Sequence, residues 1–223
     1  MAQERGWLLL TNDDGIEAVG LETLVKALHD EGYPVAVLAP SGNHSATGMR
    51  INLMKPMAYR PRDDLVERWG LNPHTTPVHL FELDGTPCDT MIVALDGGLN
   101  HLVPGVHPQM VVSGVNLGPN LSQDSYHSGT MGAAREAGLY GVPAIAASFT
   151  SFDPVGMERA VEATLDIVAA AAAVLPVKAG NLARPKGALE TTYFTTWPKP
   201  SADEPWRDHP ERALLNAFCN GDL

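Results

Sequence analysis

Four short apolar runs, each followed by small or polar residues, constrain the fold of this chain more than any other feature. They span residues 7–10, 33–40, 108–114 and 142–148. A short continuous apolar run is typical of a parallel strand that is buried on both faces. Segments with helical spacing of apolar residues separate the runs, and this alternation predicts an α/β fold with a largely parallel sheet.

The remaining segments are assigned more coarsely. We expect helices over residues 17–31, 88–95, 131–141 and 156–173, and a half-exposed strand over residues 78–85. Residues 60–75 look like a surface excursion, and residues 41–48 and 115–130 look like loops. No clear period continues beyond Pro176. We therefore predict one domain over residues 1–176 and a C-terminal segment over residues 177–223.

Net charge, cysteine content and apolar runs indicate which partners the chain can bind and in which cellular compartment it is expected. The 223 residues carry a net charge of −11, so the overall field repels a nucleic-acid polymer. The two cysteines, Cys88 and Cys219, form no disulfide framework and no zinc or redox pair. The apolar start lacks a signal peptide, and no run reaches the roughly 20 residues that span a bilayer. These features favour a cytoplasmic protein that contacts no membrane.

Three loops follow three of the expected strands, and in an open parallel sheet ligands bind beyond the carboxyl ends of the strands. The loops should therefore converge at one edge. Their side chains are mostly oxygen donors, which suit Mg²⁺, Mn²⁺ or Ca²⁺ better than zinc or copper. The set comprises Asn12, Asp13, Asp14, Asn43, His44, Ser45, Thr47, Asn116, Asn120, Ser122, Asp124, His127, Ser128 and Thr130.

The third loop adds a candidate anion site. Ser128, Gly129 and Thr130 immediately precede a helix of small residues, and free N–H groups at a helix start bind anions. A cation beside such a terminus suits a phosphate ester, because the cation neutralises phosphoryl charge and lowers the pKa of a bound water.

Taken singly, each of these signals also has a purely structural interpretation. Two aspartates and a glycine after a strand most often form a turn and helix cap, and a single histidine is most often a surface residue. The convergence of three loops at one sheet edge favours a binding site over those interpretations.

Four blocks resemble the SurE family of stationary-phase survival proteins, over roughly residues 7–150. They read "LLLTNDDGIEAVGLETLVKAL", "VLAPSGNHSATG", "DGTPCDT" and "VVSGVNLGPNLSQDSYHSGTMGAAREAGLYGVPAIAAS". The resemblance implies a Rossmann-like, mostly parallel sheet with helices on both faces and a smaller C-terminal part that takes part in assembly. It also implies a metal-dependent phosphatase of nucleoside monophosphates, acting as a 5'/3'-nucleotidase in a homodimer or homotetramer.

The resemblance assigns roles to individual residues. It implies one divalent ion per subunit, Mg²⁺ or Mn²⁺, and places Asp13, Asp14 and Asn116 in the catalytic centre. The implied metal ligands are Asp13, Asp14, Ser45 and Asn116, and the implied substrate and phosphate contacts are Asn43, Asn120, Ser128, Gly129 and Thr130.

The chain also departs from the family pattern. Where the family has a loop like "RNRSG", this chain has Gly42, His44 and Ala46 at the two arginine-type positions and the glycine position. The loss of positive charge bears on substrate preference. No clear copy of the family's later "LNVNxP"-like strand is present, so residues 177–223 are interpreted as divergent or truncated.

Two other function classes compete with the phosphomonoesterase hypothesis. Paired acids after a first strand also bind Mg²⁺ in receiver-type signalling modules, but Ser113 stands where such a module needs its phosphoacceptor aspartate. A non-catalytic relative that binds nucleotides without turnover is the other alternative, and binding without phosphate release would distinguish it.

Overall fold

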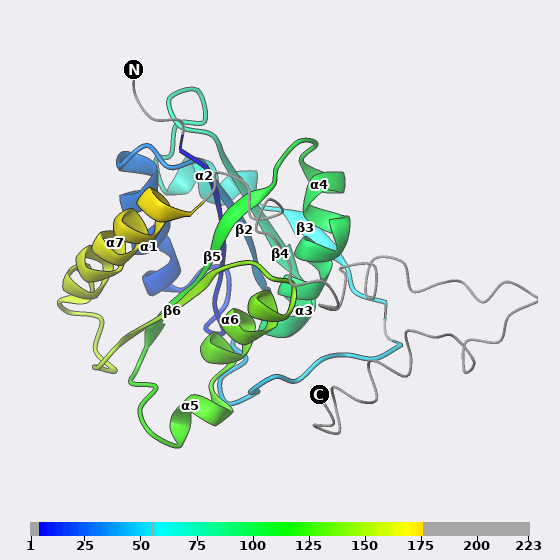
Figure 1. Ribbon diagram of the computed structural model, residues 1–223, viewed down its shortest axis with the longest axis vertical. Helices are drawn as coiled ribbons and strands as arrows, with labels where there is room; N and C mark the ends of the chain where they lie inside the picture. The colour runs from blue at the N-terminus through cyan, green and yellow to red at the C-terminus, as the bar shows by residue number, and fades with distance from the viewer. Residues whose placement is uncertain (1–4, 55, 176–223) are drawn as a thin grey trace, which may run out of the picture. The chain divides into compact units, whose positions relative to one another are not determined.

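The computed structural model describes residues 5–54 and 56–175, and its strands form a six-stranded sheet in the order β3-β4-β2-β1-β5-β6 (Figure 1). Neighbouring strands are parallel except for the antiparallel pair β3 and β4. The strands are β1 (Trp7–Thr11), β2 (Val35–Pro40), β3 (Tyr59–Pro61), β4 (Val78–Leu83), β5 (Pro108–Leu117) and β6 (Ala144–Phe149).

Helices cover both faces of the sheet, as expected. Helices α1 (Val19–Asp30) and α7 (Met157–Val174) pack together on one face, and α3 (Pro87–Val93) and α6 (Gly129–Leu139) pack together on the other (Figure 1). The shorter helices are α2 (Asp63–Arg68), η1 (Ala94–Gly98), α4 (Leu99–Leu102) and α5 (Asp124–His127). The predicted α/β fold is therefore confirmed.

The two central apolar runs form the middle of the sheet. Leu8, Leu9 and Leu10 of β1 have no exposed surface, and neither do Val35 and Val37 of the adjacent β2. Both faces of β1 are covered by helices, which is why its sequence is apolar throughout rather than alternating. This burial makes β1 a rigid support for the polar residues that follow it.

Three expectations about strands need correction. Strand β5 continues to Leu117, so Val115 and Asn116 lie in the sheet and not in a loop. Strand β4 is mostly buried rather than half-exposed. Strand β6 is only partly buried because it lies at the edge of the sheet that the described residues form.

The expected surface excursion over residues 60–75 is also wrong. It contains α2 and the last two residues of β3, and the side chains of Leu65 and Trp69 belong to the same hydrophobic core as those of α1. Arg62 lies between these two elements and is only 5% exposed. A buried arginine in a charged stretch gives no hydrophobic periodicity. The sequence pattern therefore does not reveal that this segment packs against the core.

Arg62 ties the segment that follows the central strand to the outer strands. Its guanidinium donates to Glu82 on β4 at 2.7 Å, to Glu17 at 2.7 Å and to Asp64 at 2.8 Å. Glu17 lies shortly after the Asp13–Asp14 turn and also accepts from Arg68 at 2.8 Å. The network therefore restrains the chain between β1 and α1.

The predicted segment 177–223 lies outside the described residues. The predicted boundary at residue 176 therefore stays a prediction.

We predict that Arg62→Met destabilises the fold by about 3 kcal/mol, because it leaves the nearly buried Glu82 carboxylate without its buried cation. Arg60→Met is the matched control: Arg60 contacts the same carboxylate but is 67% exposed, so its loss costs about 0–1 kcal/mol. Urea unfolding of both variants measures the difference. Equal losses would contradict the account.

Candidate active site

The strand order explains why distant loops meet. Strand β1 lies between β2 and β5, so the segments that follow these three strands leave the sheet side by side. Two backbone hydrogen bonds join them: the His44 N–H donates to the Asp13 carbonyl at 2.6 Å, and the Gly48 N–H donates to the His127 carbonyl at 2.7 Å. The convergence predicted for the three loops is present.

The turn after β1 is closed by Asn12. Its side-chain oxygen accepts from the Gly15 N–H at 3.1 Å, and its amide donates to the Gly15 carbonyl at 2.9 Å. Gly15 has φ +105°, and an added Cβ would lie 3.0 Å from the backbone of Gly42. Asn12 and Gly15 thus turn the chain tightly and leave the two aspartates at the strand end.

Asp13 is 3% exposed and is held from α6. The Thr130 hydroxyl, which has no exposed surface, donates to Asp13 Oδ1 at 2.6 Å and lies 3.3 Å from Asn116 Oδ1. Gly129 lets the helix come this close, since an added Cβ would lie 2.7 Å from Asp13 Cβ. Thr130 therefore fixes one carboxylate oxygen and leaves Oδ2 available.

Asp14 is held from β5. The Leu117 N–H donates to Asp14 Oδ2 at 3.0 Å, and no other side chain or backbone group of residues 5–54 and 56–175 binds Oδ1. Burial raises the pKa of Asp14 above its ordinary value; the bond from Leu117 opposes this shift and the adjacent Asp13 charge adds to it. Holding the ionised Asp14 beside Asp13 therefore destabilises the folded state.

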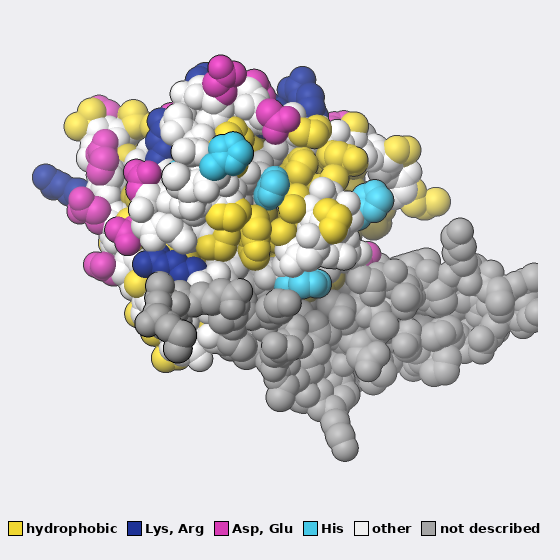
Figure 2. Space-filling view, turned by 90° about the horizontal axis from the view of Figure 1, so that it is seen from above, with side chains coloured by type: hydrophobic (Ala, Val, Ile, Leu, Met, Phe, Trp, Pro, Cys, Tyr) yellow, Lys and Arg dark blue, Asp and Glu magenta, His cyan; other side chains and the backbone are white. Residues whose placement is uncertain are grey.

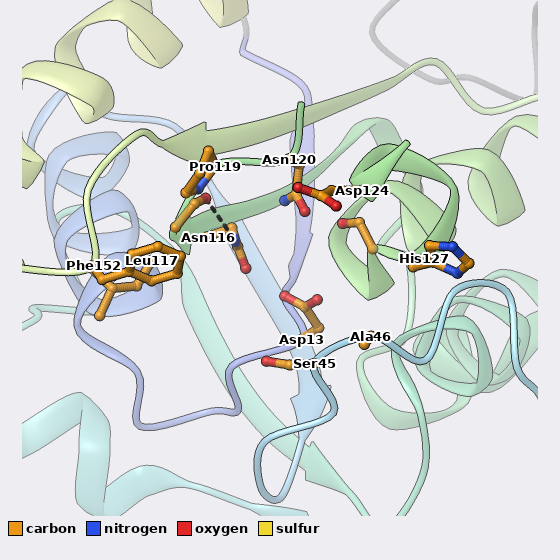
Figure 3. A pocket seen from close by; sticks show the side chains of 12 residues that line it. Asp13, Ser45, Ala46, Asn116, Leu117, Pro119, Asn120, Asp124, His127 and Phe152 are labelled. Atoms are coloured by element: carbon orange, nitrogen blue, oxygen red, sulfur yellow. Dashed lines mark hydrogen bonds between the residues drawn. The ribbon is translucent and has the colours of Figure 1, made fainter. Parts of the chain in front are cut away.

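Asn116 is oriented by its own strand end. Its amide nitrogen donates to the Gly118 carbonyl at 2.7 Å, which directs Oδ1 toward Thr130 and Asp13 (Figure 3). Asn116, Asp13 and Ser45 all line one pocket of about 220 Å³. A side-chain oxygen from each of three segments therefore faces the same space.

The pocket takes in some of the predicted site residues and not others. Asp13, Ser45, Asn116, Asn120 and Ser128 line it (Figure 3). The lining does not include Asp14, Asn43, Gly129 and Thr130. Asn43 instead accepts the Ser45 N–H at 2.9 Å, which shapes the loop that carries Ser45.

The start of α6 opens onto this pocket. The Ser128 hydroxyl caps the helix by accepting the Met131 N–H at 3.1 Å. The first N–H groups of a helix have no partner within the helix and carry partial positive charge. The pocket therefore combines carboxylate oxygens with the positive end of a helix dipole.

Charge is not balanced at the two aspartates. Over residues 5–54 and 56–175, no Lys, Arg or His pairs with Asp13 or Asp14, whereas Arg62 and its neighbours pair elsewhere. The same part of the chain holds no group of three His, Cys, Asp or Glu side chains placed to bind a metal. A cation at Asp13 and Asp14 must therefore also take hydroxyl or amide oxygens.

Ala46, at the position where the family pattern has glycine, lies in the pocket wall with φ +58°. Residues other than glycine rarely adopt this left-handed backbone conformation, which costs them about 1–2 kcal/mol. The loop keeps the backbone geometry that glycine would favour.

Two acidic side chains are buried on the paired helices α3 and α6. Burial and the nearby Asp89 raise the pKa of Glu136 on α6 to about 7. Asp89 itself closes a capping box with Thr86, as it accepts the Thr86 N–H at 2.8 Å, and binds Asn52 at 2.6 Å. The "DGTPCDT" block therefore stabilises the helix start, and sequence reasoning gave no role to Glu136.

The comparisons with known proteins now decide the family. A sequence model of the family described as "Survival protein SurE" matches residues 8–201. The chain belongs to the SurE family. The match to the SurE model extends beyond the 7–150 range on which the resemblance rested.

Individual SurE relatives agree. A protein named 5'-nucleotidase SurE from Desulfitobacterium hafniense is 39% identical over 155 residues, which cover 70% of this chain and 55% of that protein. One of the same name from an Anaeromyxobacter species is 40% identical over 147 residues, covering 66% of this chain and 50% of that protein. The chain thus spans about half the length of these relatives.

A solved structure shares the fold. The SurE protein from Aquifex aeolicus is 30% identical, with a TM-score of 0.61, and the match covers 75% of this chain and 60% of that one. In the described part of this chain, no helix is both long and apolar enough to cross a membrane.

We predict that stability falls as the pH rises from about 4.5 to about 7, because the folded state holds the Glu136 proton more tightly than the unfolded chain. A difference of one in pKa corresponds to about 1.4 kcal/mol, so the Glu136 contribution is at most about 3 kcal/mol. Glu136→Gln should remove it. Unfolding free energies of both proteins at pH 5 and pH 8 measure the effect, and identical pH profiles would contradict it.

Proposed function

We propose that the pocket is the active site of a metal-dependent phosphomonoesterase that hydrolyses nucleoside monophosphates to nucleoside and phosphate. The observation that supports this most is the arrangement of Asp13 and Asn116. Each side chain is held by an uncharged partner, and each keeps an oxygen directed at the same pocket.

The donor set fits a hard divalent cation. Asp13, Asp14, Ser45 and Asn116 offer two carboxylates, a hydroxyl and an amide oxygen, which are the ligands that Mg²⁺ and Mn²⁺ take. When bound, such an ion neutralises phosphoryl charge and lowers the pKa of a bound water. The side chains themselves supply the geometry, because Thr130 and Leu117 fix the unused oxygens of Asp13 and Asp14.

The phosphate end of the substrate belongs at the start of α6. The first N–H groups of a helix have no partner within it, so we assign the N–H groups of residues 129 and 130 to the phosphate oxygens. Ser128 orders this terminus through its capping bond. In this proposal the helix end stabilises the negative charge of the transferring group, and this kind of stabilisation is usually the largest catalytic term.

Similar proteins support the substrate class. The two relatives reported above are named 5'-nucleotidases. Because the chain spans about half of their length, we carry the activity over as a proposal. Action on 3'-nucleotides, the identity of the ion, the cytoplasmic location and a homodimer or homotetramer stay predictions.

A direct assay tests the proposal. The purified chain is stripped of metal with a chelator and incubated with a panel of nucleoside 5'- and 3'-monophosphates. Phosphate release should appear only when Mg²⁺ or Mn²⁺ is restored. Release that persists in excess chelator, or no release with any metal, would contradict the proposal.

We predict that Thr130→Val lowers activity by about 10- to 100-fold, because groups that orient a metal ligand typically contribute that much. Valine keeps the shape and removes the hydrogen bond to Asp13. Thr164→Val is the matched control, since Thr164 is also buried but bonds to Ala160 within α7. Equal activities of the two variants would refute the positioning role.

A further inference from the structure

The pocket has two chemically different sides. One side carries Asp13, Asn116 and Ser128, which we assign to the metal and phosphate. The other side is formed by Leu117, Gly118 and Pro119 and by Phe152. Figure 3 shows Phe152 and Leu117 together on one side, with His127 on the opposite side.

Phe152 keeps most of its ring uncovered. Phe152 is 80% exposed, although it forms part of the pocket wall. An aromatic ring in this position offers a flat apolar surface to whatever occupies the pocket. The other exposed aromatic residue nearby, Tyr126, does not line the pocket and lies 5.6 Å from the Arg135 guanidinium.

The ring rests on the backbone of Gly118. An added Cβ on Gly118 would lie 2.6 Å from Phe152 Cε1, so a glycine is needed for the ring to lie where it does. The Gly118 N–H donates to the Phe149 carbonyl at 3.1 Å, which joins the ends of β5 and β6 beneath the ring. The position of the ring is therefore coupled to the strand that carries Asn116.

The turn that carries the ring is ordered on its other side as well. The Asp153 N–H donates to Ser151 Oγ at 3.0 Å, and the Val155 N–H donates to Asp153 Oδ1 at 3.0 Å. The backbone on both sides of Phe152 is therefore held by hydrogen bonds, and the ring is presented to the pocket by a structured turn.

We propose that Phe152 stacks against the nucleobase of the substrate and makes the pocket selective for nucleotides over phosphomonoesters that lack an aromatic group. This inference rests on the proposed function of the pocket. Stacking is tolerant of base identity because every base has a π-face. The side chain of Leu117 beside the ring carries no hydrogen-bonding group, so this side of the pocket selects by ring surface.

The test compares adenosine 5'-monophosphate with ribose 5-phosphate, which has the same phosphate and sugar but no base. In Phe152→Ala, the ratio of kcat/KM for the two substrates should fall by about 5- to 100-fold, which is the range that one base–aromatic stack supplies. The loss should appear in KM for the nucleotide. Phe152→Trp should keep the ratio, since it keeps an aromatic face.

Val155→Ala is the control, because Val155 is 81% exposed in the same turn but does not line the pocket. Its ratio should match that of the unaltered protein. An unchanged ratio in Phe152→Ala, or an equal fall in Val155→Ala, overturns the proposal.

A binding measurement separates this inference from catalysis. In Phe152→Trp, adenosine 5'-monophosphate should quench the added tryptophan fluorescence, and ribose 5-phosphate should not. Quenching by the nucleotide in a protein that releases no phosphate would overturn the phosphomonoesterase proposal and keep the stacking. Phosphate release without selective quenching would keep the catalytic proposal and overturn the stacking.

Discussion

Two adjacent carboxylates stand at the end of the central strand, and in the described part of the chain every hydrogen bond they accept comes from an uncharged group. Like charges held together in a partly buried site repel, and burial adds to the penalty. The rest of the site is arranged around this constraint. Thr130 and the Leu117 N–H fix one oxygen of each carboxylate, and Asp13 lines the same pocket as Ser45 and Asn116.

The strand order turns this local feature into a pocket. Because β1 lies between β2 and β5, the pocket combines one side chain class from each segment: carboxylates, a hydroxyl and an amide. Close backbone approach at Gly129 lets α6 bring its positive end to Asp13. On the face shown in Figure 2, the described Lys and Arg side chains are scattered rather than gathered into a basic surface. Because the whole chain carries a net charge of −11, attraction for an anion at the pocket must be local, at the helix end and at the proposed cation.

Much of this arrangement could be predicted from the sequence, for specific physical reasons. Continuous apolar runs identified β1 and β2, and the rule that loops meet beyond strand ends brought Asp13, Ser45 and Asn116 together. Asn116 lies in β5 although the sequence predicts a loop there, because Gly114 has the pattern of a strand end. The buried Arg62 gives no sequence signal, because an ion-pair network leaves no apolar period. Phe152 is not among the predicted site residues, although the same rule applies to the turn after β6, which leaves the sheet beside Asn116.

The most direct test of the central claim is the melting temperature of Asp14→Asn with and without Mn²⁺. Asparagine can still accept the Leu117 N–H but removes the repulsion with Asp13. Without metal, the variant should therefore melt at a higher temperature than the unaltered protein. The melting temperature of the unaltered protein should rise as the Mn²⁺ concentration is increased. That of the variant should stay nearly unchanged. A metal-free variant that melts lower, or an unaltered protein that Mn²⁺ does not stabilise, would contradict the claim that a cation relieves this pair.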